Sequence, residues 1–142
     1  ADGYRLPSEA EWEHACRAGT VTPYASGMDD SLLGAYAVFL ANHTEICGSK
    51  MPNPWGLFDV HGNVYEWCHD WYDRYGNEGT LSNPMGPAHG EERALRGGAF
   101  DYAQRYVRSD IRAKNRSSYR SHTIGIRVAR SYQSVTGQNR TK

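Results

Sequence analysis

The chain has 142 residues, a length that suits a single domain, and its 4 Trp, 10 Tyr and 3 Phe are too many for a disordered or collagen-like polypeptide. No run approaches the roughly 18 apolar residues of a membrane-spanning helix, so we expect no membrane span. The 16 basic and 16 acidic residues cancel overall, but residues 1–72 hold ten acids against three bases, and residues 73–142 hold six acids against thirteen bases.

The basic charge of the second half consists mainly of spaced arginines. Eight arginines lie between Arg96 and Arg130, separated by small and polar residues. Spaced arginines suit bidentate pairing with internal carboxylates better than they suit a patch that follows a phosphate backbone. We therefore expect the two halves to neutralise each other, and we expect no nucleic-acid partner.

A helix is predicted over residues 9–18. Ser8 is a good N-cap and Glu11, three residues later, completes a capping box. Trp12, Ala15 and Cys16 fall on one face, and Gly19 follows as a terminator.

The rest of the chain is rich in Gly and Pro, which predicts short elements and much irregular structure. A short helix is expected at 30–34, and strands are expected at 64–67, 93–96 and 123–129. In the last strand the pattern places Ile124, Ile126 and Val128 on one face and Arg127 on the other.

Residues 133–142 lack aromatic side chains and are expected to form a disordered tail after a domain at 1–132.

The segment 53–71, NPWGLFDVHGNVYEWCHDW, holds two carboxylates, Asp59 and Glu66, seven residues apart around a glycine. Oxygen ligands of mixed origin on a sharply bent loop are what hard divalent cations prefer. The alternative is that Asp59 shapes a turn and that Glu66 pairs with one of the carboxy-terminal arginines.

Cys16, Cys47 and Cys68 show no spacing typical of a zinc site, and the chain has no nucleophile-elbow, phosphate-loop or dinucleotide motif.

Four blocks in a fixed order carry a resemblance to a known family. They are RLPSEAEWEHACRAG (5–19), NPWGLFDVHGNVYEWCHDW (53–71), ALRGGAF (94–100) and IGIRVAR (124–130). Together they resemble the formylglycine-generating enzymes, also called sulfatase-modifying factors, and most of all the bacterial members attached to protein kinases.

The resemblance implies an α+β fold of the C-type lectin type, with little regular secondary structure, short twisted antiparallel strands and structural calcium. Family domains begin some scores of residues earlier, so the resemblance also implies that this chain corresponds to the second half of the domain. The sequence leaves open whether a preceding part is absent from this chain or has been reduced.

The resemblance assigns one calcium site to four positions of this chain. It implies side-chain ligation by Asp59 and Glu66 and carbonyl ligation by Gly62 and Val64. A second family metal site would fall near 36–42, where the residues give no clear ligand set.

In the active enzymes of the family, two cysteines after a Gly-Gly-Ser motif bind copper. The enzyme uses this copper and oxygen to oxidise a substrate cysteine to formylglycine. The matching positions here are Tyr102 and Val107, and the serine position is Ala99. Neither side chain supplies the soft sulfur that Cu(I) prefers. We therefore expect no copper and no oxidase activity, that is, a pseudoenzyme.

What remains is a binding surface on the loop after Gly97 and Gly98, which is rich in tyrosine and arginine, residue types common in binding hot spots. The family also places structural arginines at the positions of Arg108, Arg112 and Arg127, which we interpret as internal clamps. The candidate ligand-binding residues are Phe100, Asp101, Tyr102, Arg105, Tyr106, Tyr119 and His122.

The leading hypothesis is a non-catalytic, calcium-stabilised module that binds a peptide or protein, with an attached kinase or other signalling domain as a further expected partner. The alternative is an active copper- and oxygen-dependent oxidase that matures sulfatases through an atypical metal site. The sequence leaves the cellular compartment and the ligand open.

Overall fold

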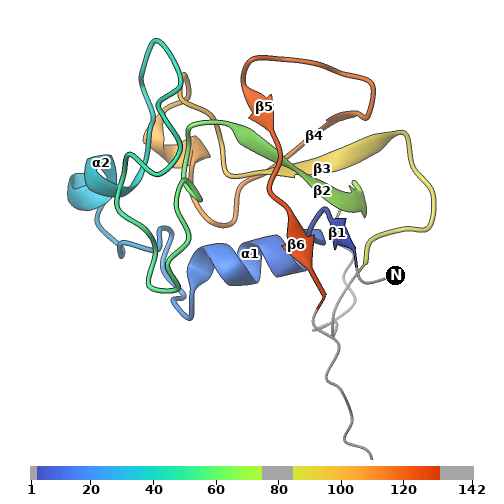
Figure 1. The fold of residues 1–142 in the computed structure, drawn as a ribbon, viewed down its shortest axis with the longest axis horizontal. Helices are drawn as coiled ribbons and strands as arrows, with labels where there is room; N and C mark the ends of the chain where they lie inside the picture. The colour runs from blue at the N-terminus through green and yellow to red at the C-terminus, as the bar shows by residue number, and fades with distance from the viewer. Residues whose placement is uncertain (1–2, 75–84, 132–142) are drawn as a thin grey trace, which may run out of the picture.

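The computed structural model describes residues 3–74 and 85–131. It shows an α+β domain in which one helix, α1, lies against a small curled sheet and long loops make up much of the rest (Figure 1). Within the described ranges no helix is both long and apolar enough to cross a membrane.

Helix α1 (Glu9–Arg17) begins at the predicted capping box. The Ser8 hydroxyl accepts from the backbone N–H of Glu11 at 3.1 Å, and the Glu11 carboxylate accepts from the backbone N–H of Ser8 at 2.7 Å. The helix ends at Ala18, whose left-handed φ of 46° turns the chain before Gly19. The prediction for this helix is confirmed to within one residue.

The main sheet has four strands in the order β4-β3-β2-β5. Its strands are β2 (Tyr65–Trp71), β3 (Glu92–Arg96), β4 (Arg112–Arg116) and β5 (Ile124–Gly125). The β2–β3 and β3–β4 pairs are antiparallel as expected, but β2 and β5 run parallel.

The two faces of this sheet carry different cores. On one face, Trp12 and Cys16 of α1 pack with Cys68 and Ala94. Because side chains alternate along a strand, the neighbouring residues of β2 and β3 point to the opposite face. There Tyr65 and Leu95 form a second cluster with Trp67, Ala113 and Ile124 against it.

A second sheet joins two distant parts of the chain. Strand β1 (Tyr4–Arg5) pairs antiparallel with β6 (Ala129–Arg130), and Figure 1 shows them side by side. The helix expected at 30–34 is present as a 3₁₀ turn, Asp30–Leu32, that continues into α2 (Leu33–Tyr36). Strands β1 and β4 were not anticipated from the sequence.

The prediction of one continuous strand at 123–129 is wrong, and so is the prediction of which side chains it buries. Only β5 and β6 form at its two ends, and Ile126 and Val128 are 67% and 57% exposed. Arg127 points inward instead and pairs with Glu66. The predicted tail at 133–142 lies outside the described residues.

Gly62 and Gly56 form a matched pair for testing the tight packing of the loop that precedes β2. Their φ angles are +79° and +80°, so an alanine is strained equally at both positions. A Cβ at Gly62 would lie 2.0 Å from the carbonyl oxygen of Val38, whereas a Cβ at Gly56 meets nothing within 4 Å.

We expect Gly56→Ala to lower the free energy of unfolding by about 1 kcal/mol and Gly62→Ala to lower it by at least about 3 kcal/mol. Urea denaturation followed by tryptophan fluorescence measures both. Equal losses for the two variants would contradict the close approach of residues 38 and 62.

Candidate ligand-binding surface

The loop after Gly97 and Gly98 is held by backbone hydrogen bonds. Both glycines have positive φ, and a Cβ at Gly98 would lie 2.6 Å from the carbonyl oxygen of Tyr106. The N–H of Phe100 donates to the carbonyl of Asn63 at 2.9 Å, and the N–H of Leu40 donates to the carbonyl of Tyr102 at 3.0 Å. The loop path is therefore fixed by main-chain contacts that do not depend on which side chains it displays.

Three of the predicted ligand-binding residues form one half-exposed cluster. Tyr102 and Tyr106 are 39% and 38% exposed, and their ring centroids lie 5.8 Å apart in an edge-to-face arrangement. Tyr102 also meets Tyr65 of β2 edge-on at 5.5 Å, and the Arg105 guanidinium lies 4.6 Å from the centre of the Tyr106 ring. We call Tyr65, Tyr102, Arg105 and Tyr106 the tyrosine cluster.

Three other predicted residues gather at a neighbouring hollow. Phe100, Asp101 and His122 line a cavity of about 440 Å³ together with residues 41–44. Phe100 is only 4% exposed and its ring packs against that of His122 at 5.8 Å, so it supports this wall and offers a ligand little surface.

Tyr119 is 47% exposed, and no contact among the described residues joins it to the tyrosine cluster or to this hollow. Its inclusion in the predicted surface therefore has no geometric support.

The buried His61 side chain connects the end of the loop to the core. Its Nε2 accepts from the backbone N–H of Ala25 at 2.9 Å, and its Nδ1 lies 2.8 Å from the carbonyl oxygen of Val107. A carbonyl only accepts, so Nδ1 carries the proton and the ring is neutral. Burial lowers the pKa of His61, which favours the same neutral form.

Glu66, one of the four predicted calcium ligands, has both carboxylate oxygens engaged by other side chains. Both oxygens of Glu66 accept from Arg127, at 2.7 and 2.8 Å, and one also accepts from the Trp12 indole at 2.6 Å. The side chain of Glu66 is 6% exposed, so this carboxylate is enclosed by its partners. This is the alternative that the sequence left open for Glu66.

Asp59 has φ +58° and accepts from the backbone N–H of Gly48 at 2.8 Å, which is the turn-shaping role of the same alternative. Gly62 and Val64 contribute backbone to the packing of this loop: the N–H of Gly62 donates to the carbonyl of Gly97, and the Val64 side chain lies against Gly125. Among the described residues, no three His, Cys, Asp or Glu side chains are grouped to hold a metal. Glu66 therefore favours the ion-pair alternative, whereas Oδ1 of Asp59 is buried without a hydrogen-bond partner among the described residues. A calcium ion at these four positions stays a prediction, and we route no function through one.

The positions that match the family's copper cysteines carry no sulfur and lie in different environments. Tyr102 is half-exposed, whereas Val107 is fully buried with Tyr24 and Leu33. Cys16 is also fully buried, 3.7 Å from the Ser109 hydroxyl, and burial raises the pKa of its thiol to about 12. A thiol that stays protonated is a poor metal ligand.

The expected internal arginine clamps are present at two of three positions. Arg112 pairs with Glu9 at 2.5 Å and Arg127 pairs with Glu66 at 2.7 Å. Arg108 instead forms a surface pair with Asp110, two residues away and about as exposed, so this assignment is wrong. The most deeply buried guanidinium, that of Arg96, was not identified from the sequence.

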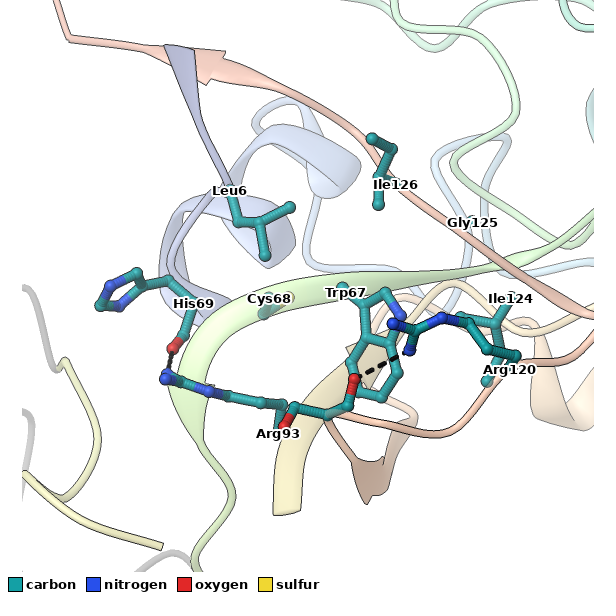
Figure 2. A pocket seen from close by; sticks show the side chains of 10 residues that line it. Leu6, Trp67, Cys68, His69, Arg93, Arg120, Ile124, Gly125 and Ile126 are labelled. Atoms are coloured by element: carbon teal, nitrogen blue, oxygen red, sulfur yellow. Dashed lines mark hydrogen bonds between the residues drawn. The ribbon is translucent and has the colours of Figure 1, made fainter. Parts of the chain in front are cut away.

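A cavity of about 500 Å³ was also missed. It lies beside Trp67 and is lined by Leu6 and Arg93 and by parts of 117–126 (Figure 2). Its wall consists of residues from four separate chain segments, so no local sequence pattern predicts it.

Comparison with known proteins gives consistent matches. Residues 1–132 match the family model described as "Sulfatase-modifying factor enzyme 1-like domain". The chain is 39% identical to a serine/threonine-protein kinase, pkn1, of Chlamydia pneumoniae, over 90% of this chain and 21% of the kinase. It is 34% identical to a formylglycine-generating enzyme of Streptomyces coelicolor, over 95% of this chain and 49% of the enzyme.

Among solved structures, variable protein 1 of Treponema denticola superposes with a TM-score of 0.85 and 34% identity, over 89% of this chain and 47% of that chain. The chain thus spans about half the length of that structure and of the enzyme, and about a fifth of the kinase.

A substitution at Glu66 tests whether this carboxylate serves in an ion pair with Arg127 or as a calcium ligand. Glu66→Gln leaves the partly buried Arg127 guanidinium without its counter-charge, so the free energy of unfolding should fall by about 2 kcal/mol or more. The control is Asp110→Asn, whose exposed pair with Arg108 should cost less than about 1 kcal/mol.

Urea denaturation with and without EDTA is the measurement. We expect EDTA to leave the wild-type midpoint unchanged. A lower midpoint for the wild type in EDTA, absent in Glu66→Gln, would establish the calcium site.

The buried neutral His61 makes a pH prediction. The unfolded chain protonates this histidine near its usual pKa of about 6.5, whereas the folded chain resists protonation. The unfolded state then binds more protons, so stability should fall as the pH drops from about 7 to about 5.5, by at most about 1.4 kcal/mol per pH unit.

The slope should flatten in His61→Gln and persist in His122→Gln, because His122 is exposed. Unfolding free energies across this pH range provide the test. A flat wild-type profile would disprove the buried neutral assignment.

Proposed function

This chain belongs to the sulfatase-modifying factor enzyme 1-like family, and on that basis we propose that it is a non-catalytic member that binds a peptide or protein through its tyrosine cluster. The observation that carries the proposal is the replacement at Tyr102: a half-exposed aromatic ring stands where the family's oxidases hold a copper-binding thiolate.

The chemistry of the site supports a binding role over an oxidase role. Copper in this family needs two thiolates close together, and the described part of the chain offers Tyr102 and Val107 at those positions. Cys16, on the buried face of α1, and Cys68, in β2, are both buried with their thiol pKa values raised. Neither is poised to substitute for the missing pair.

The tyrosine cluster has the features of a protein-recognition surface. The rings of Tyr102 and Tyr106 are amphipathic and half-exposed, and edge-on contacts with each other and with the buried Tyr65 ring hold them in place. Little side-chain freedom is therefore lost on binding. Tyr65 comes from β2, and the loop backbone is bonded to residues 40 and 63. Arg105 adds a cation beside Tyr106 that has no carboxylate partner among the described residues.

The nature of the partner is suggested by the relatives. Several of them are serine/threonine-protein kinases in which the matching region is a fifth of the chain. A module of this kind, joined to or working beside a signalling domain, would present bound peptide or protein segments to it.

Selection of peptides from a displayed random library tests the binding role. We expect the wild-type domain to enrich defined sequences, and Tyr102→Ala combined with Tyr106→Ala to weaken binding of the enriched peptide by at least about tenfold. The control is Tyr4→Ala, which removes a more exposed tyrosine, 71% accessible, at the β1–β6 end of the domain.

Binding that survives in the double variant, or is lost equally in Tyr4→Ala, would contradict the proposal. The oxidase alternative gives a different signal. Under it, incubation with copper, oxygen and a CxPxR peptide would convert the peptide cysteine to an aldehyde, detected as a loss of mass.

A further inference from the structure

We propose that the cavity beside Trp67 is a second binding site, for a small aromatic carboxylate whose anion is taken by Arg120. Trp67 and Ile124 of this site pack against the core around Tyr65, but no residue of the tyrosine cluster lines the cavity. The inference does not depend on the function proposed above.

The size of the cavity suits a small molecule. Its volume of about 500 Å³ is in the range of sites for small ligands. Figure 2 shows the Trp67 indole and Arg120 below strand β2 in this view, and Leu6 and Ile126 above it. The indole and the aliphatic side chains supply apolar lining that an aromatic ring can contact.

Apolar surface at this cavity is left open to solvent. Ile126 is 67% exposed although it is a large aliphatic residue, and Trp67 is half-buried. Ile126 faces outward because its neighbour Arg127 turns inward to Glu66. Filling the cavity with an apolar body would remove this surface from water.

The charge around the cavity is one-sided. Of the ten residues that line it, two are arginines and none is an aspartate or glutamate. Neither Arg93 nor Arg120 forms an ion pair with a carboxylate among the described residues, whereas Arg96 and Arg112, on neighbouring strands, both do. The two lining arginines therefore give the cavity an uncompensated positive potential.

Arg120 is positioned to use that charge. Its Nη1 donates to the backbone carbonyls of Ser117 and Tyr119, both at 3.0 Å, which fixes the guanidinium at the cavity (Figure 2). Its Nε and Nη2 have no acceptor among the described residues, and together they present the planar edge that a carboxylate matches with two parallel hydrogen bonds.

Arg93 contributes charge from the other end of the cavity but is already engaged. Its guanidinium donates to the carbonyl of His69 and lies 3.6 Å from the centre of the Trp71 ring. Among the described residues, Arg120 thus supplies the one free guanidinium edge at the cavity, enough for a single carboxylate.

Calorimetric titration with 1-naphthylacetate and with its uncharged analogue 1-naphthylacetamide tests the site. We expect the acid to bind at least about tenfold more tightly than the amide. Arg120→Gln should weaken the acid by about tenfold and leave the amide unchanged. Ile126→Asp, at an exposed position, should abolish binding of the acid by placing a negative charge in the cavity wall.

Arg105→Gln is the matched control, since it removes another arginine without a carboxylate partner, in this case from the tyrosine cluster. It should leave binding of the acid unchanged, and circular dichroism should show every variant folded. No heat of binding, equal affinity for acid and amide, or full affinity in Arg120→Gln would overturn the proposal. Loss of affinity in Arg105→Gln would move the ligand to the tyrosine cluster and would also overturn it.

Discussion

Arg96 on β3 has no exposed surface, and its guanidinium meets the carboxylates of Glu9 and Glu13 on α1. Arg112 on β4 holds the other side of Glu9 with two hydrogen bonds, at 2.5 and 2.7 Å. Burying these charges carries a desolvation cost that only close pairing offsets, so helix and sheet fold together or not at all. The buried ion pairs of Glu9, Glu13 and Glu66 all join an acid of the first half of the chain to an arginine of the second half.

A second buried pair determines how the carboxy-terminal segment lies on the domain. One carboxylate oxygen of Glu66 accepts a hydrogen bond from the Trp12 indole of α1, and both oxygens accept from the Arg127 guanidinium. Glu66 therefore joins α1, β2 and the carboxy-terminal segment at one point. Since neighbouring residues of an extended chain point in opposite directions, the inward turn of Arg127 sends Ile126 and Val128 outward. The same ion pair thus accounts for the engagement of both Glu66 oxygens and for the exposed apolar side chain of Ile126 beside Trp67.

The features predicted correctly from the sequence are those governed by nearby residues. The capping box of α1 is local, and the helix forms where it was expected. The apolar alternation at 124–128 suggested the wrong buried face, because the burial of Arg127 depends on Glu66, sixty-one residues away. Arg108 shows the converse error: Asp110, two residues on, is a nearer partner than any buried acid. The cavity beside Trp67 and the hydrogen bonds of His61 to Ala25 and Val107 each need several distant segments to meet. The spacing of residues along the sequence does not reveal such contacts.

The loop that carries the tyrosine cluster is separable from the scaffold beneath it. Its course is set by the carbonyls of Asn63 and Tyr102, by the left-handed turns at Gly97 and Gly98, and by the hydrogen bond between His61 and the Val107 carbonyl. Each of these contacts uses backbone atoms of the loop, and none uses the side chain of Tyr102. A residue at that position can therefore change from thiol to phenol while the loop keeps its path. This separation of backbone support from displayed side chains gives a physical reason why one fold serves both oxidases and the binding module proposed here.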